Sequence, residues 1–237
     1  MVKIESFINC AKKLNFQIFS NNSKPYNLNL WFVRNPDRVS NKFNDKLYVF
    51  WNDLTWNFRI FNVTMDPGMM VRLKPSNPLG IAIVKSHQQA KGMWKIGLHQ
   101  GKYEALVQKN PVTVIRDFNK DSILNFTIPE LKSLDFKVSK GLDGSELIEY
   151  YNGKKLVWRE NTGIFGINCH RANINGQSVN VDNWSEGCQV FQNEQILNPD
   201  TNQKCFSFDY FMQLCHLGKD NWGNSFTPTF INESDLV

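Results

Sequence analysis

Residues 163–191, GIFGINCHRANINGQSVNVDNWSEGCQVF, carry the most informative pattern in the chain. An apolar, strand-like run ends at His170 and is followed by a polar loop rich in Asn, Gly and Ser. The chain then turns back through Trp184 to Cys188 and a second strand-like run. Two short strands joined by a loop bring the end of one beside the start of the other. We therefore expect His170 and Cys188 to face each other across the mouth of the loop.

A cysteine opposite a histidine is suited to nucleophilic catalysis. The thiolate is the reactive form of cysteine, and a neighbouring imidazole takes its proton. Gly187 lets a substrate carbonyl approach the backbone, and amide N–H groups around Cys188 can form an oxyanion hole. Ser185 can orient either partner by a hydrogen bond. The alternative is a buried thiol beside a hydrogen-bonded histidine, without chemistry.

The same residues resemble the signature of the L,D-transpeptidase catalytic domain, the YkuD-type fold. That signature is a His, fourteen to seventeen residues, Ser or Thr, His, Gly, Cys, an apolar residue and Asn or Arg. Here fourteen residues separate His170 from Ser185, and Gly187 and Cys188 follow in register. The resemblance implies Cys188 as nucleophile and His170 as its base. It also implies that the backbone carbonyl of Arg171 orients the imidazole.

Three positions depart from this signature. Glu186 stands where the family has a second His, Gln189 where it has an apolar residue, and Val190 where a polar residue is usual. These departures favour an alternative in which the chain is a catalytically inactive structural or wall-binding virion protein. The turn at residues 77–80, NPLG, is similar to the family's Thr-Pro-x-Gly turn that enters a strand.

The resemblance implies peptidoglycan processing by cysteine acyl transfer. Cys188 attacks a carbonyl of a wall stem peptide, and water or an amine releases the acyl group, so the product is that of a hydrolase or of a transferase. The resemblance implies no metal or organic cofactor. Trp184 and Glu186 are candidates for substrate binding, by stacking and by accepting from a substrate amine. His99, at a predicted strand end, is a third candidate. Core packing for Trp184 and a structural role for His99 are the alternatives.

A metal site built from His170, Cys188 and Cys169 is disfavoured. Zinc needs converging ligands, whereas adjacent residues on a strand point to opposite faces. We therefore expect Cys169 to pack in the core and no metal to bind.

Composition narrows the class of protein. The 237 residues are 41% hydrophobic, with 18 Phe, 7 Trp and 6 Tyr, which is enough for a sizeable core. The net charge is +5, with Lys and Arg scattered, so nucleic acid is not an expected partner. Five cysteines, an odd number without a framework pattern, predict at least one free thiol.

The N-terminal residues, MVKIESFINCAKKL, are too polar for a signal peptide, and no apolar run reaches the length of a membrane span. We expect synthesis in the cytoplasm. Beside the resemblance, this favours a phage-encoded protein that is carried on a virion, for example in its tail, and delivered to the bacterial cell wall. Its expected partners are peptidoglycan stem peptides and other virion proteins.

The pattern along the chain predicts one α+β, mostly β domain over residues 1–237. We expect a sandwich or barrel-like mixed sheet of the L,D-transpeptidase type, with short helices near both termini. An apolar face predicts a helix at 3–14, and a β-rich body follows over 28–127. Its expected strands are 28–33, 46–51, 57–63, 80–85, 93–99, 104–108, 112–117 and 123–127.

The remaining segments are expected as follows. Residues 129–153 form an excursion or lid between two halves of one sheet. A second helix runs over 207–217, with Ser207 as its N-cap and Gly218 just past its end. A last strand at 226–231 completes the C-terminal part, 207–231.

Overall fold

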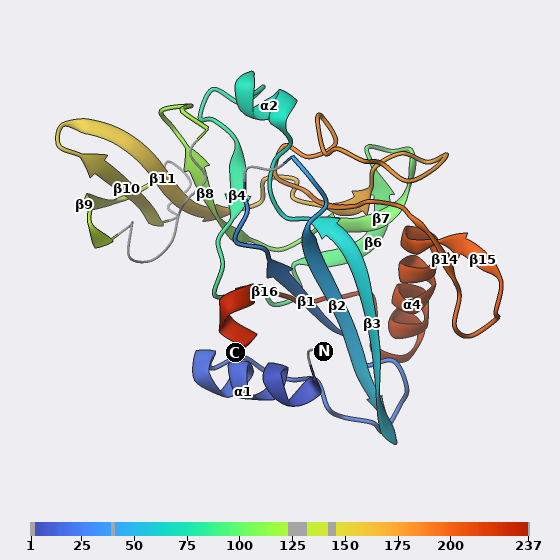
Figure 1. The fold of residues 1–237 in the computed structure, drawn as a ribbon. Helices are drawn as coiled ribbons and strands as arrows, with labels where there is room; N and C mark the ends of the chain where they lie inside the picture. The colour runs from blue at the N-terminus through green and yellow to red at the C-terminus, as the bar shows by residue number, and fades with distance from the viewer. Residues whose placement is uncertain (1–2, 39–40, 123–131, 142–145, 237) are drawn as a thin grey trace.

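The computed structural model describes residues 3–38, 41–122, 132–141 and 146–236. Strands make up 40% of the chain and helices 17%, so the protein is mostly β, with helices near both ends, as predicted. Within the described residues the strands form a curled, mixed nine-stranded sheet that resembles half a barrel, a five-stranded sheet and a two-stranded ribbon (Figure 1). The predicted strand at 123–127 lies outside the described residues.

The nine-stranded sheet has the order β5-β16-β1-β2-β3-β13-β12-β7-β6. Its strands are β1 (Asn29–Arg34), β2 (Asp45–Asp53), β3 (Thr55–Thr64), β5 (Gln88–Gln89), β6 (Trp94–His99), β7 (Tyr103–Gln108), β12 (Cys169–Arg171), β13 (Gln189–Phe191) and β16 (Pro228–Asn232). β1 pairs antiparallel with β2 and parallel with β16, and β12 pairs parallel with β13. The sheet is therefore mixed.

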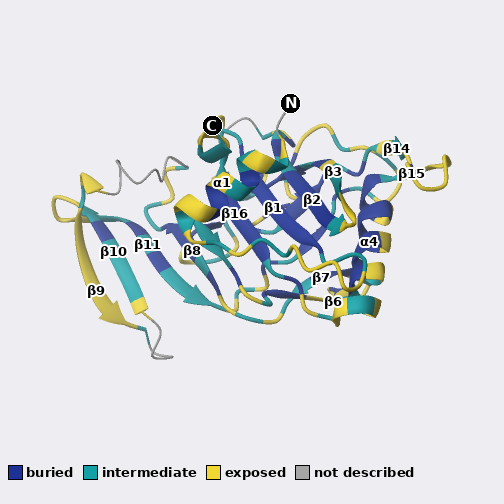
Figure 2. Ribbon diagram, turned by 90° about the horizontal axis from the view of Figure 1, so that it is seen from below, coloured by how far each residue is buried: buried dark blue, intermediate teal, exposed yellow. Residues whose placement is uncertain are grey.

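β1 lies between two cores, which explains its continuous apolar sequence. Leu30 and Phe32 enter the main core, whereas Trp31 and Val33 enter a smaller core beneath the N-terminal helix. Side chains alternate between the faces of a strand, so a strand buried on both faces is apolar throughout. Figure 2 shows β1 and β2 buried and β9 exposed.

Two longer helices cover the nine-stranded sheet. α1 (Ile4–Leu14) covers the predicted residues and packs Phe7 against Trp31, with ring centroids 5.4 Å apart. α4 (Ser207–Trp222) is longer than predicted, because Gly218 lies inside it and not past its end. A Cβ at Gly218 would lie 3.2 Å from Leu28 Cδ1, so this glycine permits close packing. Ser207 is not the N-cap: Phe206 is, and the Ser207 hydroxyl has no partner in the described chain.

The five-stranded sheet extends sideways from the body (Figure 1). Its order is β4-β8-β11-β10-β9, formed by β4 (Ala82–Val84), β8 (Val112–Asp117), β11 (Lys155–Gly163), β10 (Glu146–Asn152) and β9 (Asp135–Lys140). The predicted lid at 129–153 is thus, where described, a pair of strands at the edge of this sheet. Alternating apolar residues such as Phe136 and Val138 are the strand signal that the prediction of an excursion or lid overlooked.

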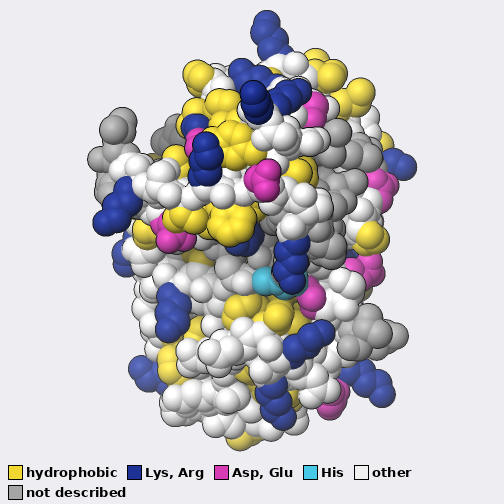
Figure 3. Space-filling view, turned by 90° about the vertical axis from the view of Figure 1, so that its left-hand side faces the viewer, with side chains coloured by type: hydrophobic (Ala, Val, Ile, Leu, Met, Phe, Trp, Pro, Cys, Tyr) yellow, Lys and Arg dark blue, Asp and Glu magenta, His cyan; other side chains and the backbone are white. Residues whose placement is uncertain are grey.

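The remaining elements are short. They are α2 (Met69–Leu73), the ribbon strands β14 (Gln195–Leu197) and β15 (Lys204–Phe206), and a 3-10 helix at Glu233–Leu236. All five cysteines are unpaired thiols. No helix in the described part of the chain has the length and apolar character needed to cross a membrane. On the face shown in Figure 3, Lys and Arg side chains are scattered and form no continuous stripe.

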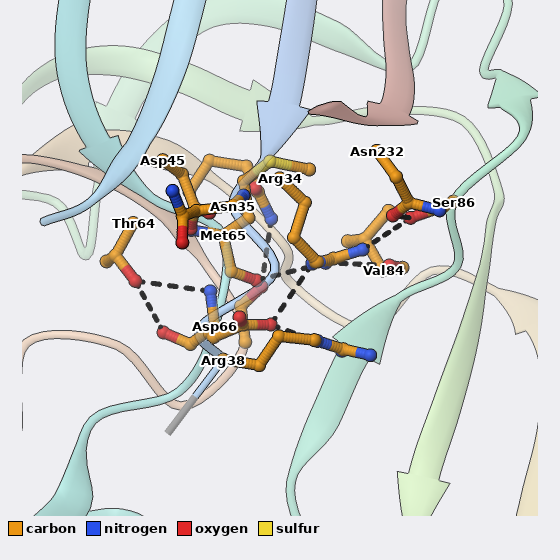
Figure 4. Close-up of polar contacts among 12 residues, drawn as sticks. Arg34, Asn35, Arg38, Asp45, Thr64, Met65, Asp66, Val84, Ser86 and Asn232 are labelled. Carbon is orange, nitrogen blue, oxygen red and sulfur yellow. Dashed lines mark hydrogen bonds and ion pairs between the residues drawn. The ribbon is translucent and has the colours of Figure 1, made fainter. Parts of the chain in front are cut away.

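A buried cluster of charges joins the end of β1, the start of β2, the segment that follows β3, and β4 (Figure 4). Arg34, the last residue of β1, pairs with Asp66 at 3.2 Å and donates to the Val84 carbonyl at 3.0 Å. Asp45 accepts from the backbone N–H groups of Asn35 and Met65, at 2.8 and 2.6 Å. Each of these polar groups is hydrogen-bonded, which is what makes their burial tolerable.

The cluster also fixes the loop that follows β3. Two residues beyond Asp66, the N–H of Gly68 donates to the Ser185 carbonyl at 2.9 Å. A Cβ at Gly68 would lie 1.9 Å from the Asp182 carbonyl oxygen, so only glycine fits this contact. The 182–185 segment, which leads to Cys188, is therefore supported from the main sheet.

Candidate active site

β12, which carries His170, and β13, which follows Cys188, lie side by side in parallel. Cys169 is opposite Gln189, and His170 is opposite Val190. We expected the end of one strand beside the start of the other, which is an antiparallel arrangement, and this expectation is wrong. The residues between the strands form a loop that returns the chain to the same end of the sheet. Cys188 precedes β13 directly, so thiol and imidazole are still brought to one region.

The apolar run at 164–167 is not a strand, contrary to expectation. Gly166 has φ +74, which interrupts extended backbone. The side-chain oxygen of Gln108 accepts from the N–H groups of Phe165 and Ile167, both at 2.9 Å. A glutamine side chain thus takes the place of a neighbouring strand for this run.

One cavity of about 920 Å³ collects most of the predicted site residues. His170, Cys188, Gly187, Arg171, Trp184, Glu186 and His99 all line it. Ser185 does not line the cavity. It is fully buried, and its hydroxyl donates to the Cys188 carbonyl at 2.8 Å and accepts from the Gly187 N–H at 3.3 Å. Ser185 therefore supports the backbone at Cys188.

The His170 ring is held in one orientation. Its Nδ1 lies 2.8 Å from the backbone carbonyl oxygen of Arg171. Because a carbonyl oxygen only accepts, Nδ1 carries the proton and Nε2 keeps its lone pair. Burial is the largest cause that lowers the pKa of His170, to about 4, and the nearby His99 is the next. The hydrogen bond to the Arg171 carbonyl acts in the opposite direction and raises this pKa. The imidazole is thus neutral at pH 7 and able to accept a proton.

Cys188 is half-buried, and its sulfur sits between two backbone groups. The Asn168 N–H donates to Sγ at 3.4 Å, and the thiol is 3.6 Å from the Gly166 carbonyl. Burial raises the pKa of Cys188 to about 11; the Asn168 N–H lowers it and Glu186 adds to the rise. The resting group is therefore a thiol, and an attack on a carbonyl needs a base to remove its proton.

Gly187 is required by the backbone. Its φ is +142, and a Cβ there would lie 2.5 Å from the carbonyl oxygen of Ala82 in β4. We expected this glycine to admit a substrate carbonyl, whereas in the structure it admits a carbonyl of the protein. The N–H groups of Gly187 and Gln189 are engaged by Ser185 Oγ and the Asn168 carbonyl. Of the three amides around the thiol, that of Cys188 remains the candidate oxyanion donor.

The predicted substrate-binding residues differ in their surroundings. Trp184 is 40% exposed at the cavity, so the alternative of core packing is wrong. The Glu186 carboxylate accepts from the N–H and the hydroxyl of Ser76, each at 2.7 Å. The guanidinium of Arg171 lies over the Tyr103 ring, 3.9 Å from its centroid. His99 is buried but lines the cavity.

Sequence reasoning missed Asn168, Tyr103 and Arg116, among other residues of this site. Asn168 contacts both the thiol and His99, whose Nδ1 lies 3.1 Å from the amide nitrogen. Its position two residues before His170 is a weak signal. Tyr103 faces His99 across the β6–β7 hairpin, and its hydroxyl is 3.3 Å from the Arg171 carbonyl. Arg116, from β8, lines the cavity and has no signal in its neighbourhood of the sequence.

Cys169 points away from the cavity, as predicted, and is fully buried in the main core. Among the described residues, no group of three or more His, Cys, Asp or Glu side chains is placed to hold a metal ion. No protein-family model, no curated protein and no solved structure matches this chain.

Proposed function

We propose that this chain is a cysteine-dependent acyl-transfer enzyme that acts on peptidoglycan stem peptides, as an L,D-transpeptidase or an L,D-carboxypeptidase does. One observation carries the proposal. A neutral imidazole, oriented by the Arg171 carbonyl, and a half-buried thiol open into the same cavity of about 920 Å³. A cavity of this size holds a short peptide.

The proposed reaction begins with proton transfer from the Cys188 thiol to Nε2 of His170 as the sulfur attacks the peptide carbonyl. The carbonyl oxygen becomes an oxyanion, and the Cys188 N–H is the candidate donor to it. The C–N bond then breaks, the leaving amine takes the proton from Nε2, and a thioester remains. Water or a second amine attacks the thioester, and the thiol is restored. Water gives hydrolysis, and an amine gives a cross-link.

A second candidate function is a wall-binding or structural virion protein that has lost turnover. The raised pKa of Cys188, to which the neighbouring Glu186 contributes, favours it. In the described chain the sulfur is hydrogen-bonded to backbone groups, so the thiol is also consistent with a packed side chain that has no catalytic role.

Mass spectrometry of peptidoglycan fragments incubated with the protein tests the proposal. The controls are Cys188→Ala, and Cys205→Ala as a matched loss of another partly buried thiol. We expect the wild type and Cys205→Ala to remove or exchange a terminal stem residue, and Cys188→Ala to do neither. The mass of the product separates hydrolysis from transpeptidation. Unchanged fragments with all three proteins, together with sedimentation of the protein on isolated walls, would replace the enzyme by the wall-binding candidate.

A further inference from the structure

The cavity carries an excess of positive charge. Its charged lining residues, with both imidazoles neutral, are Lys102, Arg116, Arg171 and Glu186. Three cations thus face one carboxylate. A concave surface of one sign concentrates ligands of the opposite sign. A ligand with a carboxylate is therefore favoured over a neutral or cationic one.

Arg116 is buried, whereas Lys102 is exposed and Arg171 is half-buried. The Arg116 side chain lies on the cavity wall, yet the residue is only 6% exposed. Nη1 donates to the Gly80 carbonyl at 3.1 Å, and the guanidinium lies 5.2 Å from the Phe165 ring centroid. Nε has no acceptor within the described chain. A buried guanidinium normally makes several charge-assisted hydrogen bonds, and this one is left short of acceptors.

Among the described residues that line the cavity, Glu186 is the one acid, and it does not supply the missing acceptor. Glu186 lies near enough to oppose the effect of burial, which lowers the pKa of Arg116. Both carboxylate oxygens of Glu186, however, accept hydrogen bonds from Ser76 at 2.7 Å. The ion pairs within 4.0 Å in the described part of the chain do not include Arg116 with Glu186.

The other arginine of the lining is already engaged. The guanidinium of Arg171 lies against the rings of Tyr103 and Phe208, with centroid distances of 3.9 and 5.8 Å. Of the two arginines of the lining, Arg116 is thus the one that is buried with a donor left without an acceptor in the described chain.

We infer that Arg116 binds a carboxylate of the ligand and makes the cavity selective for acyl donors that carry a negative charge close to the scissile carbonyl. The selectivity for acyl donors rests on the proposed function. The anion site beside Cys188 does not depend on it. A guanidinium is suited to the task because it presents a planar set of donors that matches a carboxylate.

The anion site is tested by charge-matched thiol reagents. The probes are 2-sulfonatoethyl and 2-(trimethylammonium)ethyl methanethiosulfonate, which are alike in size and opposite in charge. The Cys188 thiolate forms a disulfide with either reagent and releases methanesulfinate. The rate of modification at Cys188 is followed by peptide mass spectrometry, with the distant Cys205, also partly exposed, as the internal reference thiol.

At low salt we expect the anionic reagent to modify Cys188 faster than the cationic one, by on the order of tenfold, and salt to reduce the preference. Arg116→Gln should bring the ratio close to that at Cys205. Lys12→Gln, the same loss of charge on the exposed side of α1, should leave it unchanged. A preference that survives Arg116→Gln, or one for the cation, overturns the inference.

Two further variants guard against an Arg116→Gln protein that does not fold. Arg116→Lys keeps the charge and should keep most of the preference. Glu186→Gln removes the carboxylate that lines the cavity and should increase the preference for the anion; a decrease contradicts the inference. None of these measurements needs turnover. A protein that fails to process peptidoglycan but shows the Arg116-dependent preference loses the proposed function and keeps the anion site. A protein that processes peptidoglycan without that preference keeps the proposed function and loses the anion site.

Discussion

The imidazole of His99 stacks on that of His170, with ring centroids 4.1 Å apart and planes inclined by 20°. The side chain of Asn168 holds the His99 ring, because its oxygen accepts from the Gln108 N–H and its nitrogen donates to His99 Nδ1. Protonation of both rings would bring two positive charges together in a buried place. The pair therefore keeps His170 neutral, the state in which it can act as a base.

Replacing His99 by phenylalanine should raise the pKa of His170. The variant keeps an aromatic ring in the stack and removes the imidazole of His99. The charge of His99 disfavours protonation of His170. Proton NMR titration of the four histidines measures the shift. His216→Gln, at a partly exposed histidine that pairs with Glu104, is the control. An unchanged His170 pKa would mean that burial and the charge of Arg171 depress it without His99.

Glu186→Gln should lower the pKa of Cys188. The carboxylate raises the pKa of the thiol, and the amide carries no charge. With a pKa of about 11, only about one thiol in ten thousand is ionised at pH 7. Alkylation of Cys188 by iodoacetamide should therefore accelerate up to about pH 11 in the wild type and reach its plateau at lower pH in the variant. A wild-type midpoint near neutrality would reveal a preformed thiolate–imidazolium pair instead.

Local sequence patterns predict the elements whose apolar spacing can be recognised within one segment of the chain. α1 follows from its apolar spacing, and β1 follows from its run of apolar residues. The parallel pairing of β12 with β13 does not follow, because it depends on the strands at their outer sides. β12 pairs with β7 at Leu106, and β13 pairs with β3 at Val63 and Thr64. No local signal specifies such partners.

The residues of the candidate site likewise divide into those that the sequence predicts and those that it does not. His170, Cys188 and the glycine before it are recognisable because their spacing is short and their chemistry is distinctive. Arg116 and Ser76 come from segments distant in the sequence, and the pairing of β8 with β4 brings Arg116 to the cavity. The apolar run at 164–167 misleads because the side chain that satisfies it, that of Gln108, is more than fifty residues away.

Gly187→Ala should destabilise the fold strongly. The residue has φ +142, and its Cβ would lie 2.5 Å from the Ala82 carbonyl oxygen, so strain and overlap add. We expect a loss of about 2–4 kcal/mol in the free energy of unfolding, measured by urea denaturation. Gly176→Ala lies in the same loop with nothing within 4 Å, and should change stability by less than about 1 kcal/mol. Equal effects of the two changes would contradict the close contact with β4.

Asp66→Asn should cost more than the loss of an exposed carboxylate. Asp66 pairs with Arg34 at 3.2 Å and with Arg38 at 3.3 Å, and these side chains are at most 10% exposed. Removal of one partner of a buried ion pair typically costs about 3–5 kcal/mol. Glu104→Gln removes a carboxylate that is 57% exposed and pairs with His216, and should cost less than about 1 kcal/mol. Urea denaturation at pH 8 compares the two, and a small loss for Asp66→Asn would show that the cluster is not held by charge.

The same variant should also flatten the pH dependence of stability. Burial and, next, the charge of Asp66 raise the pKa of Asp45 from 3.8 to about 7. A carboxyl group that binds its proton more tightly when folded stabilises the fold fully below the unfolded pKa, and this contribution is lost as pH rises through the folded pKa. In the wild type, Asp45 therefore makes unfolding progressively easier between about pH 4 and 7. Without the charge of Asp66 the pKa of Asp45 falls, so less stability is lost over this interval. Free energies of unfolding of both proteins at pH 5, 6, 7 and 8 measure the two slopes, and parallel slopes would exclude Asp66 as a cause of the raised pKa.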